Sequence, residues 1–250
     1  MLWPFEKKGQ TLLNSYWQFL RAGPEIISAS ISPQELNLSW IKKNKKTKII
    51  DIKSHKKFLF KNLEFEKSIV FNPTKISSFL KNFAKENSIK NATFAISICG
   101  PTIFEKILTL STSTPEKKDL NLKELKNLKW DYTYLGPSVK NGFEFYICGM
   151  KREILFQYKL LGIKSGIKPV VITTAKTAQI EFYKYLKGEN FRQNQLVIDL
   201  QNSNYNIQSI FTPETIAKKI KLNQNIEAEI KEDYPLLATN IGLFLLGNKL

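Results

Sequence analysis

A chain of 250 residues that is 42% hydrophobic and 12% aromatic can bury a core as one domain or as two lobes, which excludes a disordered polymer. Its net charge of +16 comes almost wholly from lysine, because only Arg21, Arg152 and Arg192 are arginine. Lysine lacks the forked donors that suit base and phosphate recognition, so a nucleic-acid site is not favoured. A contact with anionic lipid headgroups needs only diffuse charge, and we regard it as an alternative of the same standing as a nucleic-acid site.

Residues 1–22 predict a short amphipathic helix that ends at Gly23 and Pro24. Docking on the core is one interpretation, and contact with a membrane or a partner through Tyr16, Trp17 and Leu20 is the other. We expect no signal peptide and no bilayer-spanning segment. The most apolar stretch, 235–246, has about a dozen residues, whereas a spanning helix needs about 20.

Hydrophobic periodicity then predicts an alternation of strands and helices along the rest of the chain. The strands are expected at 25–31, 36–41, 48–53, 91–98, 103–110, 130–135, 142–148, 167–172, 196–200 and 205–211. The helices are expected at 73–86, 151–164, 177–186, 213–231 and 236–246. The first three strands follow each other through short turns, which indicates an antiparallel meander.

Few residues of the chain carry catalytic or metal chemistry. Cys99 and Cys148 lie in apolar runs and fit neither a zinc spacing nor a disulfide framework, so they are expected to be buried thiols in a reducing compartment. The single histidine, His55, lies among lysines and is expected in a solvated loop. Asp131 and Glu144 could face each other across the predicted hairpin, but no substrate cue accompanies them. We therefore predict no catalytic residue, no metal ligand and no cofactor.

A strand, a polar turn and a second strand occur at 26–41 and again at 196–211. Two lobes that each begin with such a hairpin are the layout of the actin-like ATPase fold. The order of five segments resembles the PilM family of pilus-assembly proteins, especially its shortened HofM-type members. The segments are ISASISPQELNLSWI, ATFAISICGPTIFEKILTL, YICGMKREILFQYKLLGIKSGIKPVVITTAKTAQIEFYKYL, LVIDLQNSNYNIQSI and YPLLATNIGLFLLGN.

The resemblance implies a mixed α/β, ribonuclease-H-like two-lobe fold that is reduced and lacks the usual nucleotide-binding subdomain. An N-terminal helix would cover 1–24. The first lobe would cover 25–172, with an inserted subdomain at about 71–149, and a reduced second lobe would cover 173–250.

At the positions of the family's first phosphate loop, the residues of this chain differ from the family pattern. Ser30 replaces the carboxylate that would organise Mg²⁺, and a hydroxyl supplies no charge to hold the ion. Ser32 replaces a glycine, and Pro33 after it has no N–H to donate. Asn37 stands where the family has a lysine. Ser30, Ser32 and Asn37 are expected to be vestigial positions of the loop, as are Asp199 and Gln201 of the second loop.

The second phosphate loop keeps one carboxylate, Asp199, but Gln201 replaces the next glycine. The stretch between Thr212 and Tyr234 is too short for the nucleotide-binding subdomain and has no Gly-Gly signature. We interpret Asp199 as a structural turn residue and expect ATP binding to be lost.

By this resemblance the protein would be a non-enzymatic scaffold in the cytoplasm, peripheral at the inner membrane. It would bind the cytoplasmic tail of a bitopic, PilN-like protein in a type IV pilus or type II secretion platform. Two alternatives remain, an active ATP-binding actin-like protein and a basic nucleic-acid-binding protein.

Overall fold

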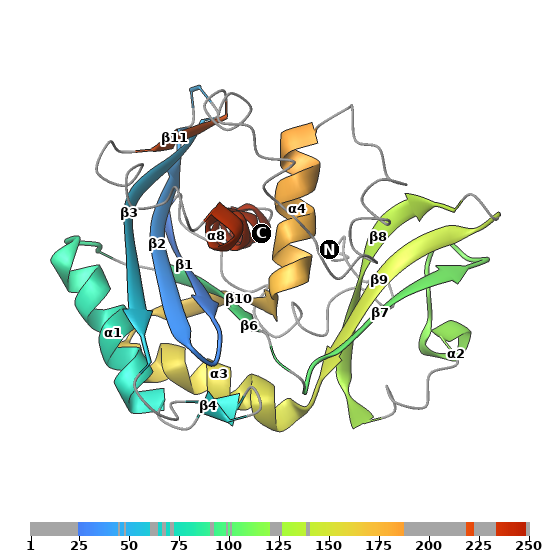
Figure 1. Ribbon diagram of the computed structural model, residues 1–250, viewed down its shortest axis with the longest axis horizontal. Helices are drawn as coiled ribbons and strands as arrows, with labels where there is room; N and C mark the ends of the chain where they lie inside the picture. The colour runs from blue at the N-terminus through green and yellow to red at the C-terminus, as the bar shows by residue number, and fades with distance from the viewer. Residues whose placement is uncertain are drawn as a thin grey trace, which may run out of the picture.

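A mixed six-stranded sheet, called the main sheet below, forms the centre of the molecule in the order β10-β6-β1-β2-β3-β11 (Figure 1). Its strands are β1 (Glu25–Ile31), β2 (Glu35–Lys43), β3 (Ile50–Leu59), β6 (Thr93–Ile98), β10 (Lys168–Thr174) and β11 (Ile220–Leu222). The computed structural model describes residues 25–44, 46–47, 49–60, 65–66, 69–70, 73–90, 93–98, 100, 102–120, 127–138, 141–187, 219–222 and 234–248.

The predicted meander is confirmed, because β1 pairs antiparallel with β2 and β2 pairs antiparallel with β3. The strands β6 and β10 then run parallel to β1 on its other side. Both faces of β1, β6 and β10 are buried, as is typical of parallel strands covered by helices. The mixed α/β class expected from the sequence is therefore correct.

Two pairs of helices cover the two faces of the main sheet (Figure 1). The first pair is α1 (Pro73–Glu86) and α3 (Arg152–Ser165), and the second is α4 (Ala175–Lys187) and α8 (Tyr234–Asn248). Proline suits the first position of α1 because its missing N–H has no partner there in any helix. The helix α8 is mostly apolar, which suits its place between the main sheet and α4.

A three-stranded antiparallel sheet, called the small sheet below, lies beside the main body in the order β7-β9-β8 (Figure 1). Its strands are β7 (Phe104–Leu110), β8 (Lys129–Pro137) and β9 (Phe143–Met150), and the short α2 (Lys117–Leu120) accompanies them. One of its faces carries an aromatic cluster that includes Trp130, Tyr132 and Phe145. A two-residue pair, β4 (Phe65–Glu66) and β5 (Ile69–Val70), completes the described elements.

Two predicted elements differ in the structure. A helix was expected over 213–231, but Ile220–Leu222 is a strand, β11, that pairs in parallel with the start of β3. The strand β3 runs on to Leu59, so His55 lies in a strand and not in a loop as expected. The predicted helix at 1–22 and the predicted strands at 196–211 lie outside the described residues. Within the part of the chain that is described, no helix is both long and apolar enough to cross a membrane.

Candidate functional site

The turn between β1 and β2 stands where the first phosphate loop was expected. Ser32 N donates to Glu35 O at 2.9 Å, which closes the turn. The Ser32 hydroxyl oxygen accepts from the backbone N–H of Gln34 at 3.3 Å and from that of Glu35 at 3.2 Å. Pro33 between them has no N–H. The backbone donors of this turn are therefore bound by its own serine side chain, as in other serine turns, and do not converge on an outside ligand.

Because its side chain accepts two hydrogen bonds in this turn, we expect Ser32 to contribute measurably to the stability of the protein. Replacing Ser32→Ala removes the acceptor of two backbone N–H groups and is expected to lower the free energy of unfolding by about 1 kcal/mol. Urea denaturation would measure the loss. The matched control is Ser78→Ala on the exposed side of α1, where alanine favours the helix and no loss is expected. Equal stability of the two variants would contradict the role given to Ser32.

Asn37, which the family resemblance aligns with a lysine, is fully buried on β2. Its side-chain N–H donates to Glu35 Oε1 at 2.9 Å, and Lys57 Nζ lies 3.0 Å from Glu35 Oε2. Lys57 on β3 is the direct cross-strand partner of Asn37. The ammonium group of Lys57 thus reaches this end of the sheet from the neighbouring strand β3, but it forms an ion pair with Glu35. Nothing in the sequence singled out Lys57, because only the register of β2 and β3 brings it there.

A row of polar side chains crosses the main sheet at this level, on the face that α8 covers. Ser30 pairs in register with both Asn37 and Ser97, and Ser97 pairs with Thr173. All four are buried. They lie toward the carboxyl ends of the parallel strands β1, β6 and β10, which is where ligands of open α/β sheets commonly bind.

The row carries hydroxyl and amide groups but no carboxylate, so it lacks the charge that Mg²⁺ sites use. Among the described residues, no group of three or more His, Cys, Asp or Glu side chains could hold a metal ion. Ser30, which the family resemblance aligns with a magnesium-organising acid, provides only a hydroxyl.

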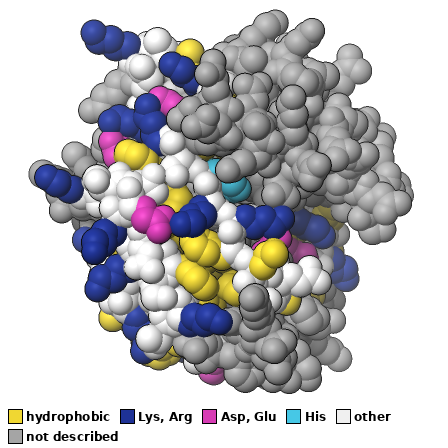
Figure 2. Space-filling view, turned by 60° about the vertical axis from the view of Figure 1, so that its left-hand side comes forward, with side chains coloured by type: hydrophobic (Ala, Val, Ile, Leu, Met, Phe, Trp, Pro, Cys, Tyr) yellow, Lys and Arg dark blue, Asp and Glu magenta, His cyan; other side chains and the backbone are white. Residues whose placement is uncertain are grey.

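Asn240 of α8 ties this helix to the polar face of the sheet. Its side-chain N–H groups donate to Ser39 Oγ at 2.8 Å and to the backbone oxygen of Asn37 at 3.4 Å, across more than 200 residues of sequence. Ser39 Oγ lies 2.8 Å from Nδ1 of His55, which is half-buried and reaches the surface (Figure 2). Four buried polar atoms of this face have no hydrogen-bond partner among the described residues: Ser28 Oγ, Ser97 Oγ, Asn37 Oδ1 and Asn240 Oδ1. The layer under α8 is thus buried and polar.

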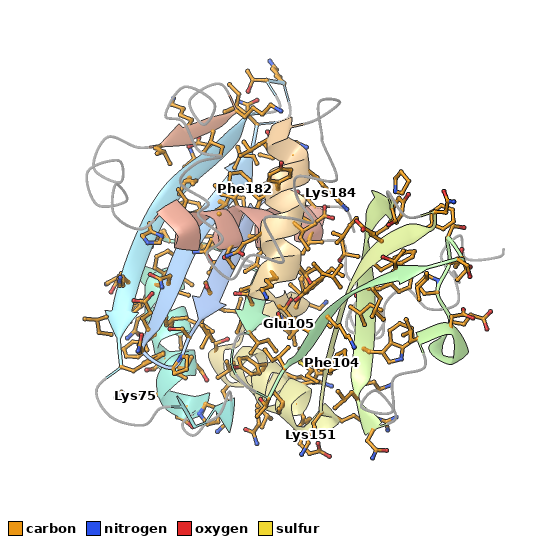
Figure 3. All side chains as sticks on the ribbon, turned by 45° about the vertical axis from the view of Figure 1, so that its right-hand side comes forward. Lys75, Phe104, Glu105, Lys151, Phe182 and Lys184 are labelled. Atoms are coloured by element: carbon orange, nitrogen blue, oxygen red, sulfur yellow. The ribbon has the colours of Figure 1, made fainter. Side chains whose placement is uncertain are left out.

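A second polar network joins the small sheet to α4. The Tyr146 hydroxyl donates to Glu105 Oε1 at 2.5 Å, and Lys176 Nζ lies 3.4 Å from Glu105 Oε2. Lys184 donates to the backbone oxygen of Tyr134 at 2.8 Å. Figure 3 shows Glu105 and Lys184 in this region between the small sheet and α4. Burial raises the pKa of Tyr146 well above its ordinary value, so the phenol stays protonated and remains a donor.

The fold does not bring the remaining candidate residues, Asp131, Glu144 and Cys148, together into a catalytic site. Asp131 pairs in register with Cys148 and Glu144 pairs with Gly136, so the two carboxylates do not face each other and the paired arrangement is wrong. Cys148 is buried as expected. Burial and the nearby charge of Asp131 raise the pKa of its thiol, which disfavours the reactive thiolate.

Other predicted site residues lie outside the described part of the chain. These are Asp199 and Gln201 of the second phosphate loop and Tyr16, Trp17 and Leu20 of the N-terminal segment. The structure therefore locates Ser30, Ser32 and Asn37 at one end of the main sheet and adds Lys57, Ser97 and Asn240 to them.

No protein-family model and no curated protein sequence matches this chain. By fold, it matches the structure described as the PilM-PilN type IV pilus biogenesis complex with a TM-score of 0.56 and 10% identity, over 92% of this chain and 99% of the other. The actin-like fold and the similarity to PilM-type proteins expected from the sequence are therefore confirmed, at the level of the fold.

Two further structures match less well. The cytoplasmic domain of EpsL, an inner membrane component of the type II secretion system of Vibrio cholerae, has a TM-score of 0.38 and 7% identity over 62% of this chain and 57% of that one. The ethanolamine utilization protein EutJ from Carboxydothermus hydrogenoformans has a TM-score of 0.37 and 8% identity over 94% and 95% of the two chains.

Proposed function

Since the chain shares an actin-like fold with PilM-type proteins, we propose that it is a non-catalytic scaffold of a type IV pilus or type II secretion platform. It acts in the cytoplasm, peripheral at the inner membrane, and binds the cytoplasmic tail of a PilN-like membrane protein. The observation that carries this proposal is the fold match to the PilM-PilN structure across 92% of the chain.

The non-catalytic part of the proposal is supported by the β1–β2 turn. An ATPase loop holds phosphate with backbone N–H groups that point at the ligand. Here Ser32 Oγ accepts from two of these groups, Pro33 lacks the third, and Lys57 is paired with Glu35. A phosphate at this turn would have to break these bonds and would find no carboxylate at Ser30 for its magnesium ion.

Titration with Mg-ATP tests this part directly. We expect no heat of binding at ATP concentrations up to about 1 mM, where a functional site with a dissociation constant in the micromolar range would be saturated. Binding in the micromolar range would overturn the non-catalytic assignment and favour the alternative of an active ATP-binding protein of the same fold.

The tail-binding part of the proposal needs a surface that takes an extended or helical peptide. The small sheet offers one, because β7 and β8 are its outer strands and neither has a further strand partner among the described residues. Backbone groups on an outer strand can pair with an added strand, and side-chain pockets then select the sequence. We propose the region 92–148 and the predicted N-terminal helix as the candidate contacts.

Pull-down with the partner's cytoplasmic tail tests the binding. The full chain is expected to retain the tail. Deleting residues 1–22 separates the two candidate contacts: a lost signal assigns the tail to the N-terminal segment, and an unchanged signal removes that segment and leaves the small sheet. Failure of the full chain to retain any tail of a PilN-like protein would contradict the proposed function.

A further inference from the structure

We propose that the outward faces of α1 and α3, called the α1–α3 face below, form a surface that rests on anionic lipid headgroups. The inference rests on the proposed function, since peripheral placement at a membrane is part of it. It adds which side of the molecule meets the lipid.

The charge on these two helices is strongly one-sided. They carry six cations, at Lys75, Lys81, Lys85, Arg152, Lys159 and Lys164, and two carboxylates, at Glu86 and Glu153. Glu86 already pairs with Lys56 of β3 at 2.7 Å, so it offsets little of the positive charge of its own helix. Figure 2, in which the side that carries β3 and α1 comes forward, shows more basic than acidic side chains on this side. Such a surface is complementary to anionic headgroups.

Exposed apolar side chains lie within this basic surface. Phe156 is 54% exposed and Ile163 is 60% exposed, and both lie on α3. They are seven residues apart, which is two helical turns, with the half-buried Leu160 between them on the same stripe. An apolar stripe flanked by long basic side chains is the pattern of helices that lie in the membrane interface, since lysine stems can extend to the headgroups while apolar side chains enter the acyl boundary.

The two helices form one continuous layer. They pack side by side on the main sheet, and Lys164 Nζ at the end of α3 donates to Thr74 Oγ1 at the start of α1 at 3.0 Å. Their inward sides hold core residues such as Phe83 and Tyr158, so their outward sides face solvent together. Figure 3 shows Lys75 and Lys151 at the lower margin of the molecule, beside this layer.

Lipid fits this surface better than a protein partner does. Five of the six cations are lysine, a point charge that needs no fixed geometry, whereas recognition of a specific carboxylate favours arginine. A stable protein interface buries roughly 800 Å² on each partner. The two exposed apolar side chains of this face supply much less apolar area than such an interface needs. A weak, charge-dependent contact with a membrane is what such a surface can supply.

Sedimentation with vesicles tests the proposal on the full chain. The vesicles are phosphatidylcholine alone or phosphatidylcholine with about one third phosphatidylglycerol, and each lysine near the surface is worth roughly fivefold in binding. The test variant is Lys81→Gln, Lys85→Gln and Lys164→Gln. The matched control is Lys46→Gln, Lys106→Gln and Lys221→Gln, which removes the same charge from exposed positions on other elements.

We expect the chain to bind only the anionic vesicles and to lose binding as salt rises. The test variant should bind about 10²-fold more weakly, and the control variant less than about fivefold more weakly, because only the first set faces the lipid. Phe156→Ser with Ile163→Ser should weaken binding about tenfold and leave the salt dependence in place. Equal weakening by the two lysine variants, or no binding of the unaltered chain to anionic vesicles, would overturn the proposal.

Tail pull-down with the same variants separates this inference from the proposed function. If the tail is retained while vesicle binding fails or does not depend on the α1–α3 face, only the membrane surface is wrong. If vesicle binding follows the expected pattern while no tail is retained, the membrane surface stands and the proposed partner is wrong. Urea denaturation of each variant would confirm that these exposed substitutions leave the protein folded.

Discussion

Replacing Gly242→Ala is expected to destabilise the protein by at least about 3 kcal/mol, at the upper end of what overpacking costs. Gly242 lies where α8 crosses α4, and an added Cβ would be 1.8 Å from the backbone oxygen of Ala178 and 2.4 Å from its carbonyl carbon. These are backbone atoms, so no rotamer change relieves the clash. The two helices would have to separate, and the apolar contacts between them would be lost.

Urea denaturation measures this effect, and Gly166→Ala is its control. Gly166 ends α3 in the left-handed region at φ 71°, with open space around the position of a Cβ. In the control variant, backbone strain alone should lower the free energy of unfolding, by about 1 kcal/mol. Similar losses for the two variants would show that the α4–α8 crossing adjusts easily, contrary to the close approach at Gly242.

Replacing Asn240→Asp is the second large effect we expect, about 3 to 5 kcal/mol of lost stability at neutral pH. The substitution keeps the shape of the side chain but removes the N–H groups that donate to Ser39 and to the backbone oxygen of Asn37. It also places a carboxylate at a fully buried position that faces these oxygens. A buried charge that retains at most the Ser39 hydroxyl as a donor costs more than the two hydrogen bonds that it replaces.

The loss should depend on pH in a defined direction. Burial raises the pKa of the new carboxyl in the folded protein above the value of about 3.9 in the unfolded chain. The folded state then binds more protons than the unfolded state, so the stability of the variant falls as pH rises through the folded-state pKa. The deficit relative to the unaltered protein should be larger at pH 8 than at pH 5.

Asn248→Asp is the matched control on the same helix. Asn248 lies at the exposed end of α8, where its side chain donates to the backbone oxygen of Phe244. Water solvates a carboxylate there, so a loss of at most about 1 kcal/mol with little dependence on pH is expected. A deficit at position 240 as small and as insensitive to pH as the one at 248 would mean that the layer under α8 is open to water.

Prediction from sequence succeeded where the signal was local. The helix at 73–86 was placed at its observed bounds because Pro73 opens it and Ile76, Leu80 and Phe83 recur at three- and four-residue spacing. The first hairpin was found because β2 alternates polar and apolar residues. The strand β3 was cut short because its second half reads as lysines around His55. Pairing with β2, and not its own composition, keeps that half extended.

The candidate site was only partly predictable. The substitutions at Ser30, Ser32 and Asn37 were visible as departures from a family pattern. That Ser32 binds the N–H groups of its own turn was not visible, since this depends on the turn conformation. The expected pairing of Asp131 and Glu144 failed for another reason: the register of β8 and β9 places Asp131 opposite Cys148 and Glu144 opposite Gly136.

By itself, the sequence determined most of the described helices and strands, and it showed serine at the two positions where the family resemblance predicts an acid and a glycine. Those features depend on side-chain periodicity and residue type over a few neighbouring positions. Only the tertiary structure decided that Lys57 neutralises Glu35 and that Asn240 closes the polar layer over Ser39. These contacts join residues from about 20 to about 200 positions apart, and strand register and helix packing, which no short segment specifies, bring them together.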